Sequence, residues 1–245
     1  MEIHKLQKQW EKFGKDDPMR AVITDLAEGD HSWDPADFFQ TGRDDIDRVM
    51  QMLAARGIAF ERGRALDFGC GVGRLTQALA RHFDEAVGVD ISEPMLAAAS
   101  LHNASPGRVR FIKNVATDLS VFPDRSFDFI FTHIVLQHLE PRLALGYVTE
   151  FLRVAKPGGL VVFQIPTRRI RRHLRYAVIR RLPWVARAYR RLRWGLALPA
   201  LEMHVVPHET IAGLVREHGG EILTVEPDGA AGANFGSSVY VIRKI

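Results

Sequence analysis

The chain has 245 residues and a formal net charge of +4, and its 47% hydrophobic and 25% charged residues are ordinary for one globular domain with a substantial core. It contains no apolar run of about 18 residues, which argues against a membrane-spanning helix, and its first residues lack the apolar stretch of a secretion signal. We therefore expect a cytoplasmic protein. The only cysteine, Cys70, excludes an internal disulfide and has no visible base partner, so we expect it to pack in the interior.

Residues 1–60 form an acidic N-terminal segment that also carries several aromatic residues. The pairs Asp34-Pro35 and Thr41-Gly42 are turn or helix-start signals. Apolar residues then recur at helical spacing over residues 46–54, which predicts a helix that packs beside the first strand. The neighbouring pair Phe38-Phe39 fits either a core position or contact with a bound ligand.

The stretch 64–79 carries the most informative pattern in the chain. Residues 65–68 form a short apolar run of the kind found in buried parallel strands. Apolar residues between Leu75 and Leu79 give one face of a helix whose N-terminus points back at the end of this strand. Between the two lie three glycines, which allow a tight turn with backbone N–H groups close to a ligand: Gly69, Gly71 and Gly73. The pattern predicts a nucleotide-type cradle.

A second apolar strand, residues 87–89, ends in an acid, Asp90. An acid at the tip of this strand is placed to accept both hydroxyls of a ribose. The glycine spacing is GxGxG rather than GxGxxG, and no basic residue stands where a pyrophosphate would need one. A dinucleotide is therefore disfavoured.

The remaining elements complete a sheet. Ser92 is a suitable cap for a helix that begins near Glu93-Pro94, and residues 143–155 have helical periodicity before a KPGG stop. The last two strands alternate like an antiparallel hairpin. Further strands are expected at residues 109–112, 128–131, 160–165, 221–225 and 238–245. The sequence thus predicts an α/β fold with a seven-stranded, mostly parallel sheet and helices on both faces.

Five motifs occur in order along the chain: LDFGCGVGRLT (66–76), VGVDIS (87–92), FPDRSFDFIF (122–131), VLQHL (135–139) and RVAKPGGLVVF (153–163). In this combination the sequence resembles the class I S-adenosylmethionine-dependent methyltransferases that act on small molecules. The resemblance implies a Rossmann-like fold and S-adenosylmethionine as cofactor. It also implies one domain in three parts, with a capping segment at 1–60, a core at 61–166 and 201–245, and a basic helical insert at 167–200.

The resemblance implies a set of cofactor contacts. Asp67 and the glycine loop would hold the methionine end and Asp90 the ribose, while FFQTG (38–42) resembles an entry motif near the methionine moiety. The loop after the third strand holds the adenine in relatives, but the common GDA form is missing here, so the adenine contact is open, with Asp118 as a substitute. The implied set is Asp67, Gly69, Cys70, Gly71, Gly73, Asp90, Ile91, Asn114, Val115, Ala116, Thr132, His133, Phe39 and Gly42.

Three histidines are candidate catalytic bases, since a histidine is suited to remove a proton from an attacking hydroxyl. His138 and His133 follow the fourth predicted strand, at the edge of the sheet where ligands bind. His204 lies in a segment that resembles one returning to the active site and ranks below them. Each can instead be structural, bonded to a neighbouring loop or lying at the surface. No cluster of His, Asp and Glu has metal-ligand spacing, so no metal is predicted.

The insert holds the excess of positive charge. Eleven arginines lie between Thr167 and Gly195 without any Asp or Glu, so the rest of the chain has 33 − 11 = 22 basic residues against 29 acidic ones. Apolar residues at helical spacing on both sides of Pro183 predict a pair of amphipathic basic helices. Three interpretations remain open: a lid over the site, contact with an anionic membrane surface through Arg168–Arg193, or binding of an anionic substrate or nucleic acid.

Nucleic acid is disfavoured by the acidic remainder of the chain and by the absence of an NPPY-like motif after the fourth strand. The sequence predicts a methyltransferase that O-methylates a small hydroxylated acceptor, such as a sugar, a phenolic or quinone compound, or a lipid headgroup. The alternative is a non-catalytic S-adenosylmethionine-binding sensor or scaffold that docks an anionic partner through the insert. Nothing in the sequence indicates the oligomeric state.

Overall fold

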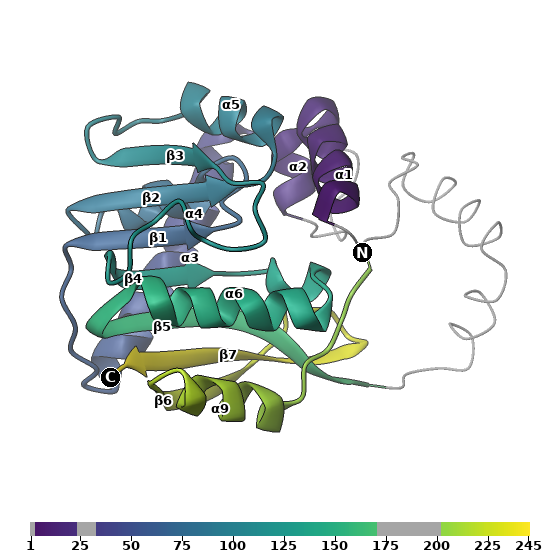
Figure 1. Ribbon diagram of the computed structural model, residues 1–245. Coiled ribbons are helices and arrows are strands. Elements are labelled where there is room, and N and C mark those ends of the chain that lie inside the picture. Colours follow the sequence, from purple (N-terminus) through teal and green to yellow (C-terminus); the bar gives the residue numbers. More distant parts are fainter. Residues whose placement is uncertain (1–2, 24–32, 171–201) are drawn as a thin grey trace, which may run out of the picture.

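A seven-stranded sheet forms the centre of the protein (Figure 1). The computed structural model describes residues 3–23, 33–170 and 202–245. The strand order is β3-β2-β1-β4-β5-β7-β6, in which β1 to β5 are parallel and β7 is antiparallel to β5 and to β6. The strands are β1 (Arg64–Phe68), β2 (Glu85–Asp90), β3 (Val109–Lys113), β4 (Phe127–Thr132), β5 (Ala155–Arg169), β6 (Gly220–Asp228) and β7 (Phe235–Lys244). The predicted mostly parallel sheet with its C-terminal hairpin is confirmed.

Helices cover both faces of this sheet, as the sequence predicts. One face packs against α6 and α9, which Figure 1 shows in front, and the other packs against α3 and α4. Helix α5 lies beside β3, and α1 packs against α5. The described helices are α1 (Ile3–Asp16), α2 (Pro18–Val22), α3 (Pro35–Ala55), α4 (Arg74–Leu79), α5 (Glu93–Leu101), the 3₁₀ helix η1 (Leu136–His138), α6 (Pro141–Val154) and α9 (His208–Glu217).

Strand β1 shows why the central strands read as short apolar runs. Leu66 and Phe68 enter the core on the α6 side, whereas Ala65 enters the core on the α3 side. Because successive side chains point to opposite faces, a strand covered on both faces is apolar at nearly every position. Its carboxyl end is fixed between β2 and β4, and the glycine loop begins at that point.

Local signals set the helix starts. Ser92 caps α5 by accepting the Met95 N–H, and Asp34 caps α3 by accepting the Ala36 N–H at 2.8 Å. Both predicted starts are confirmed. The expectation of a turn or helix start at Thr41-Gly42 is wrong, because both residues lie inside α3.

Close packing explains the glycine inside α3. A Cβ built on Gly42 would lie 2.5 Å from the backbone carbonyl oxygen of Arg74, the first residue of α4. Only glycine lets these two helices approach so closely, so Gly42 serves helix packing rather than a turn.

Strand β5 is longer than predicted. It runs to Arg169, which pairs with Phe235 of β7, so residues 167–169 belong to the sheet and Arg168 does not lie on a basic helix. The rest of the predicted insert, including both basic helices, lies outside the described residues. Among the helices that the structure describes, none is long and apolar enough to cross a membrane.

Candidate functional site

A cavity of about 510 Å³ lies at the carboxyl ends of the parallel strands. Its walls come from the glycine loop, the end of β2, the segment after β4, helices α1 and α2, and the loop between β6 and β7. Most of the lining side chains are apolar. Ligands in open α/β sheets bind at this edge, and the volume is typical of a small-molecule site.

The glycine loop forms one wall of this cavity. Gly69, Gly71 and Gly73 have φ angles of +73°, +52° and +77°, in the left-handed region that favours glycine. Gly69 and Gly71 line the cavity, and a Cβ on Gly69 would lie 2.5 Å from the side chain of Val135. The predicted tight turn is therefore confirmed, and it brings bare backbone to the cavity.

The N–H groups of this loop bond within the protein. Those of Gly69 and Cys70 donate to the Val89 carbonyl oxygen at 2.8 and 3.1 Å, and that of Gly71 donates to Asp90 Oδ2 at 2.8 Å. The loop backbone lies at the cavity, as predicted, but these three N–H groups already have acceptors within the protein. Because Gly69 and Gly71 have no side chains, a ligand can still come close to the backbone of this loop.

Asp90, at the tip of β2, borders the cavity, as do Asp16 and Asp17 at the junction of α1 and α2. The two Asp90 carboxylate oxygens accept the N–H groups of Gly71 and Ser92, each at 2.8 Å, which fixes the side chain at the tip of β2. Burial raises the pKa of Asp90, and the backbone N–H bonds offset part of this effect. Each carboxylate oxygen can accept more than one hydrogen bond, so Asp90 keeps capacity for hydroxyl donors.

Three predicted cofactor residues lie behind the cavity and do not line it. Asp67 is 1% exposed, and its Oδ2 accepts the Thr76 hydroxyl at 2.6 Å. Burial raises the pKa of Asp67 to about 6, while the Thr76 hydroxyl lowers it by a smaller amount. Cys70 is buried, and burial raises the pKa of its thiol, as expected for a packing residue. The hydroxyl of Thr132 is buried without a hydrogen-bond partner in the described part of the chain.

The loop after β3 contributes one residue to the cavity, Asn114. Its amide holds the loop itself, since Nδ2 donates to the Asp118 carbonyl oxygen at 2.7 Å and Oδ1 accepts the Ala116 N–H at 3.1 Å. Val115 and Ala116 do not line the cavity. The Asp118 carboxylate accepts the Ser120 N–H instead and does not line the cavity either.

The N-terminal cap over the cavity comes from α1 and α2. Leu6, Trp10 and Phe13 of α1 line the cavity, whereas Phe39 and Gly42 do not. Phe39 packs edge-on against Phe38, which is completely buried. The structure thus favours the core interpretation of FFQTG. Sequence analysis predicted a capping segment at 1–60 but did not single out α1, whose signal was the helical spacing of its apolar residues.

His138 lines the cavity, but both of its ring nitrogens bond within the protein. Nδ1 lies 3.2 Å from the Glu202 carbonyl oxygen and therefore donates, and Nε2 lies 3.1 Å from Gln137 Nε2 and therefore accepts. Burial lowers the pKa of His138, the Glu202 carbonyl raises it and His204 lowers it further, with a net lowering. The ring is neutral, and its one lone pair is already in use.

His133 also lines the cavity and has a different partner. Its Nε2 lies 3.8 Å from Oδ1 of Asp228, the last residue of β6, and its ring stacks on Phe131. Sequence analysis did not single out Asp228, because the antiparallel hairpin brings it to β4 from far along the chain. The predicted strand ended at residue 225, three residues before Asp228, whereas β6 runs on to Asp228.

His204 does not line the cavity, although the preceding residue, Met203, does. Its backbone N–H donates to the Gln137 carbonyl oxygen at 2.9 Å, and its Nε2 is buried, 3.9 Å from Glu202. The geometry gives it no direct access to a ligand.

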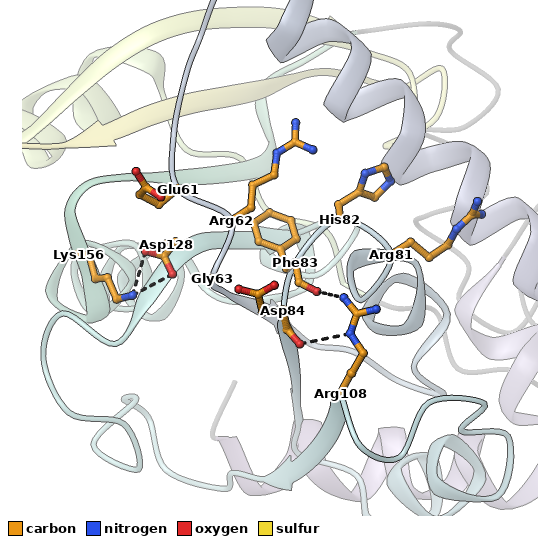
Figure 2. Close-up of a pocket in the computed structure, with 10 residues that line it drawn as sticks. All are labelled: Glu61, Arg62, Gly63, Arg81, His82, Phe83, Asp84, Arg108, Asp128 and Lys156. Carbon is orange, nitrogen blue, oxygen red and sulfur yellow. Dashed lines mark hydrogen bonds and ion pairs between the residues drawn. The ribbon is translucent and has the colours of Figure 1, made fainter.

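A second pocket, of about 650 Å³, lies at the opposite edge of the sheet (Figure 2). Several of its charged side chains have partners within the protein. Both Asp128 oxygens lie 2.9 Å from Lys156 Nζ, and Arg108 donates to the carbonyl oxygens of Phe83 and Asp84. Figure 2 shows the Arg62 and Arg81 side chains pointing away from the Asp128–Lys156 pair. The cavity with Asp90 lies at the carboxyl ends of the parallel strands, where ligands of open α/β sheets bind, and is therefore the candidate site.

Comparison with known proteins agrees with this geometry. Residues 66–163 match the family model described as a methyltransferase domain. Demethylmenaquinone methyltransferase of Clavibacter sepedonicus is 39% identical over 49% of this chain and 47% of its own length. The domain at residues 66–163 belongs to the class I S-adenosylmethionine-dependent methyltransferases. Ubiquinone biosynthesis O-methyltransferase of Methylococcus capsulatus is 31% identical over 58% of this chain and 59% of its own length.

A solved structure has a similar fold over nearly the whole chain. The structure of magnesium protoporphyrin IX methyltransferase from Synechocystis PCC 6803 with bound SAH has a TM-score of 0.64 and 17% identity over 99% of both chains. At this identity the match shows a shared fold. The chain spans about half the length of the curated relatives it matches.

Proposed function

We propose that this protein transfers the methyl group of S-adenosylmethionine to a hydroxyl of a small phenolic or quinol acceptor. The observation that carries the proposal is one apolar cavity in which the glycine loop, Asp90 and His133 meet. The relatives named above include an O-methyltransferase of ubiquinone biosynthesis. Among the acceptors that the sequence leaves open, an aromatic ring fits walls built by Trp10, Phe13 and Phe68 better than a sugar does.

The residues present fit the cofactor of the family. Asp90 is fixed at the strand tip and is suited to hold the ribose hydroxyls, and the backbone at Gly69 and Gly71 leaves room that a Cβ would fill. Ile91 and Asn114, which line the same wall, are suited to contact the adenine. When bound, S-adenosylmethionine supplies an activated methyl group with a good leaving group, so the protein mainly orients the acceptor and excludes water.

Calorimetry of S-adenosylmethionine and S-adenosylhomocysteine binding tests the cofactor half of the proposal. Asp90→Ala is expected to weaken binding at least about 10-fold, the loss of roughly two hydrogen bonds to a charged group. Asp118→Ala is the matched control, since that carboxylate does not line the cavity, and its affinity should stay within about twofold of the wild type. Equal affinities for all three proteins would contradict the proposed site.

The acceptor half is tested by S-adenosylhomocysteine formation with 4-hexylcatechol, which combines a phenolic hydroxyl with an apolar chain. The dimethyl ether of the same compound has no free hydroxyl and should give only the background rate. Cofactor binding without turnover of any hydroxylated acceptor would favour the alternative, a non-catalytic sensor or scaffold.

A further inference from the structure

The hairpin of β6 and β7 brings an acid to the histidine that follows β4. His133 Nε2 and Asp228 Oδ1 lie 3.8 Å apart, and the two side chains are only 20% and 19% exposed. In the described part of the chain, no other acid comes within 4 Å of the His133 ring nitrogens. The pair borders the cavity, since His133 lines it and the loop that begins just after Asp228 contributes Ala230.

Asp228 is itself held in place. Its Oδ2 accepts the Ala230 N–H at 2.9 Å and lies 3.5 Å from the Ser237 hydroxyl. Burial raises the pKa of Asp228, but the contacts with His133, Ala230 and Ser237 outweigh burial, so the net shift is downward and the group is ionised at neutral pH. A fixed negative charge thus faces one nitrogen of the His133 ring.

The other histidine at the cavity lacks such an arrangement. The lone pair of His138 accepts the Gln137 amide, so His138 has no free nitrogen with which to accept a proton. Nε2 of His133 faces Asp228, and no hydrogen bond to another described residue uses Nδ1, so Nδ1 is available to accept a proton in the tautomer that carries its proton on Nε2.

We propose that Asp228 is a positioning residue that holds His133 as the base for the acceptor hydroxyl. This inference rests on the proposed function. The acceptor O–H bond breaks as its proton passes to Nδ1 of His133, and the oxygen electron pair forms the new O–CH₃ bond. The electron pair of the broken C–S bond stays on sulfur. The Asp228 carboxylate stabilises the imidazolium formed in this step.

Asp228→Asn separates this role from a structural one. The carboxamide keeps an oxygen for the Ala230 N–H and so preserves the loop, but it removes the charge that faces His133. We expect kcat with 4-hexylcatechol to fall at least about 10-fold, while the calorimetric Kd for S-adenosylhomocysteine stays within about twofold. Glu226→Gln is the matched control, because Glu226 lies on the same strand and pairs with Arg56 and Thr224 at the surface, and its kcat should be unchanged.

A double-mutant cycle completes the test. In a His133→Gln background, Asp228→Asn should change kcat less than about twofold, because Asp228 acts through His133. Wild-type kcat in Asp228→Asn, or equal losses in both backgrounds, would overturn the inference while leaving the methyltransferase function intact. Absence of wild-type turnover with any hydroxylated acceptor would overturn the proposed function, and the inference with it.

Discussion

Replacement of the buried acid Asp67 tests the electrostatics behind the glycine loop. Asp67 is completely buried beside the Thr76 hydroxyl, and burial raises its pKa from 3.8 to about 6. A raised folded-state pKa means that the folded protein holds its proton up to higher pH than the unfolded chain. Stability from this group is therefore fully present below pH 3.8 and is lost as pH rises through about 6. The shift of about two units corresponds to about 3 kcal/mol, of which about 2 kcal/mol falls between pH ~4.5 and pH ~7.5.

Asp67→Asn removes the titration and keeps an oxygen that can accept the Thr76 hydroxyl. Urea unfolding of both proteins at the two pH values measures the difference directly. The free energy of unfolding of the variant, minus that of the wild type, should rise by about 2 kcal/mol from the lower to the higher pH. Acids that do not interact with Asp67, such as Glu150, whose pKa is lowered by the Arg153 side chain, titrate equally in both proteins and cancel. A difference that is the same at both pH values would refute the assignment of the buried proton to Asp67.

Two further substitutions test the packing of the fold by urea unfolding. Gly42→Ala should lower the free energy of unfolding by about 1–3 kcal/mol, because its Cβ would meet the Arg74 carbonyl oxygen at 2.5 Å. Gly213→Ala in α9 is its control and should raise stability by about 0.5–1 kcal/mol, because nothing lies within 4 Å of the added Cβ; a loss there would contradict the steric argument. Arg153→Ala should cost about 2 kcal/mol, since the guanidinium donates to the Leu119 and Phe122 carbonyl oxygens, and an unchanged urea midpoint would show that this anchoring contributes little.

The sequence was sufficient for features that depend on residues close along the chain. Apolar runs ended by glycine gave the parallel strands, because a strand covered by helices on both faces admits few polar residues. Caps at Asp34 and Ser92 gave the helix starts, because each side chain bonds an N–H two or three residues later. The glycine loop and Asp90 belong to the same class, since consecutive strands bring them together.

The features that sequence analysis missed depend on contacts between distant segments. Gly42 looked like a turn because glycine weakens a helix, yet the approach of α4 requires it. The sequence left Phe39 open between a core position and a ligand contact, and in the structure it packs against Phe38 and does not line the cavity. The acid at Asp228 reaches His133 only through the pairing of β6 with β7 and β7 with β5, which the alternation of the last strands predicts without fixing its register.

A buried chain of hydrogen bonds explains how two histidines five residues apart come to differ. Gln137, which bonds His138, accepts from Gln164 Nε2 of β5 at 3.3 Å, and Gln164 also bonds the Ser237 hydroxyl of β7. Ser237 in turn contacts Asp228 of β6, which faces His133. This series of contacts therefore connects the two histidines through β5, β7 and β6. The His138 ring is neutral and its lone pair accepts a hydrogen bond from Gln137. The His133 ring instead faces the acid Asp228. The sheet therefore gives the two histidines different surroundings: the lone pair of His138 is engaged by Gln137, whereas an acid faces the ring of His133.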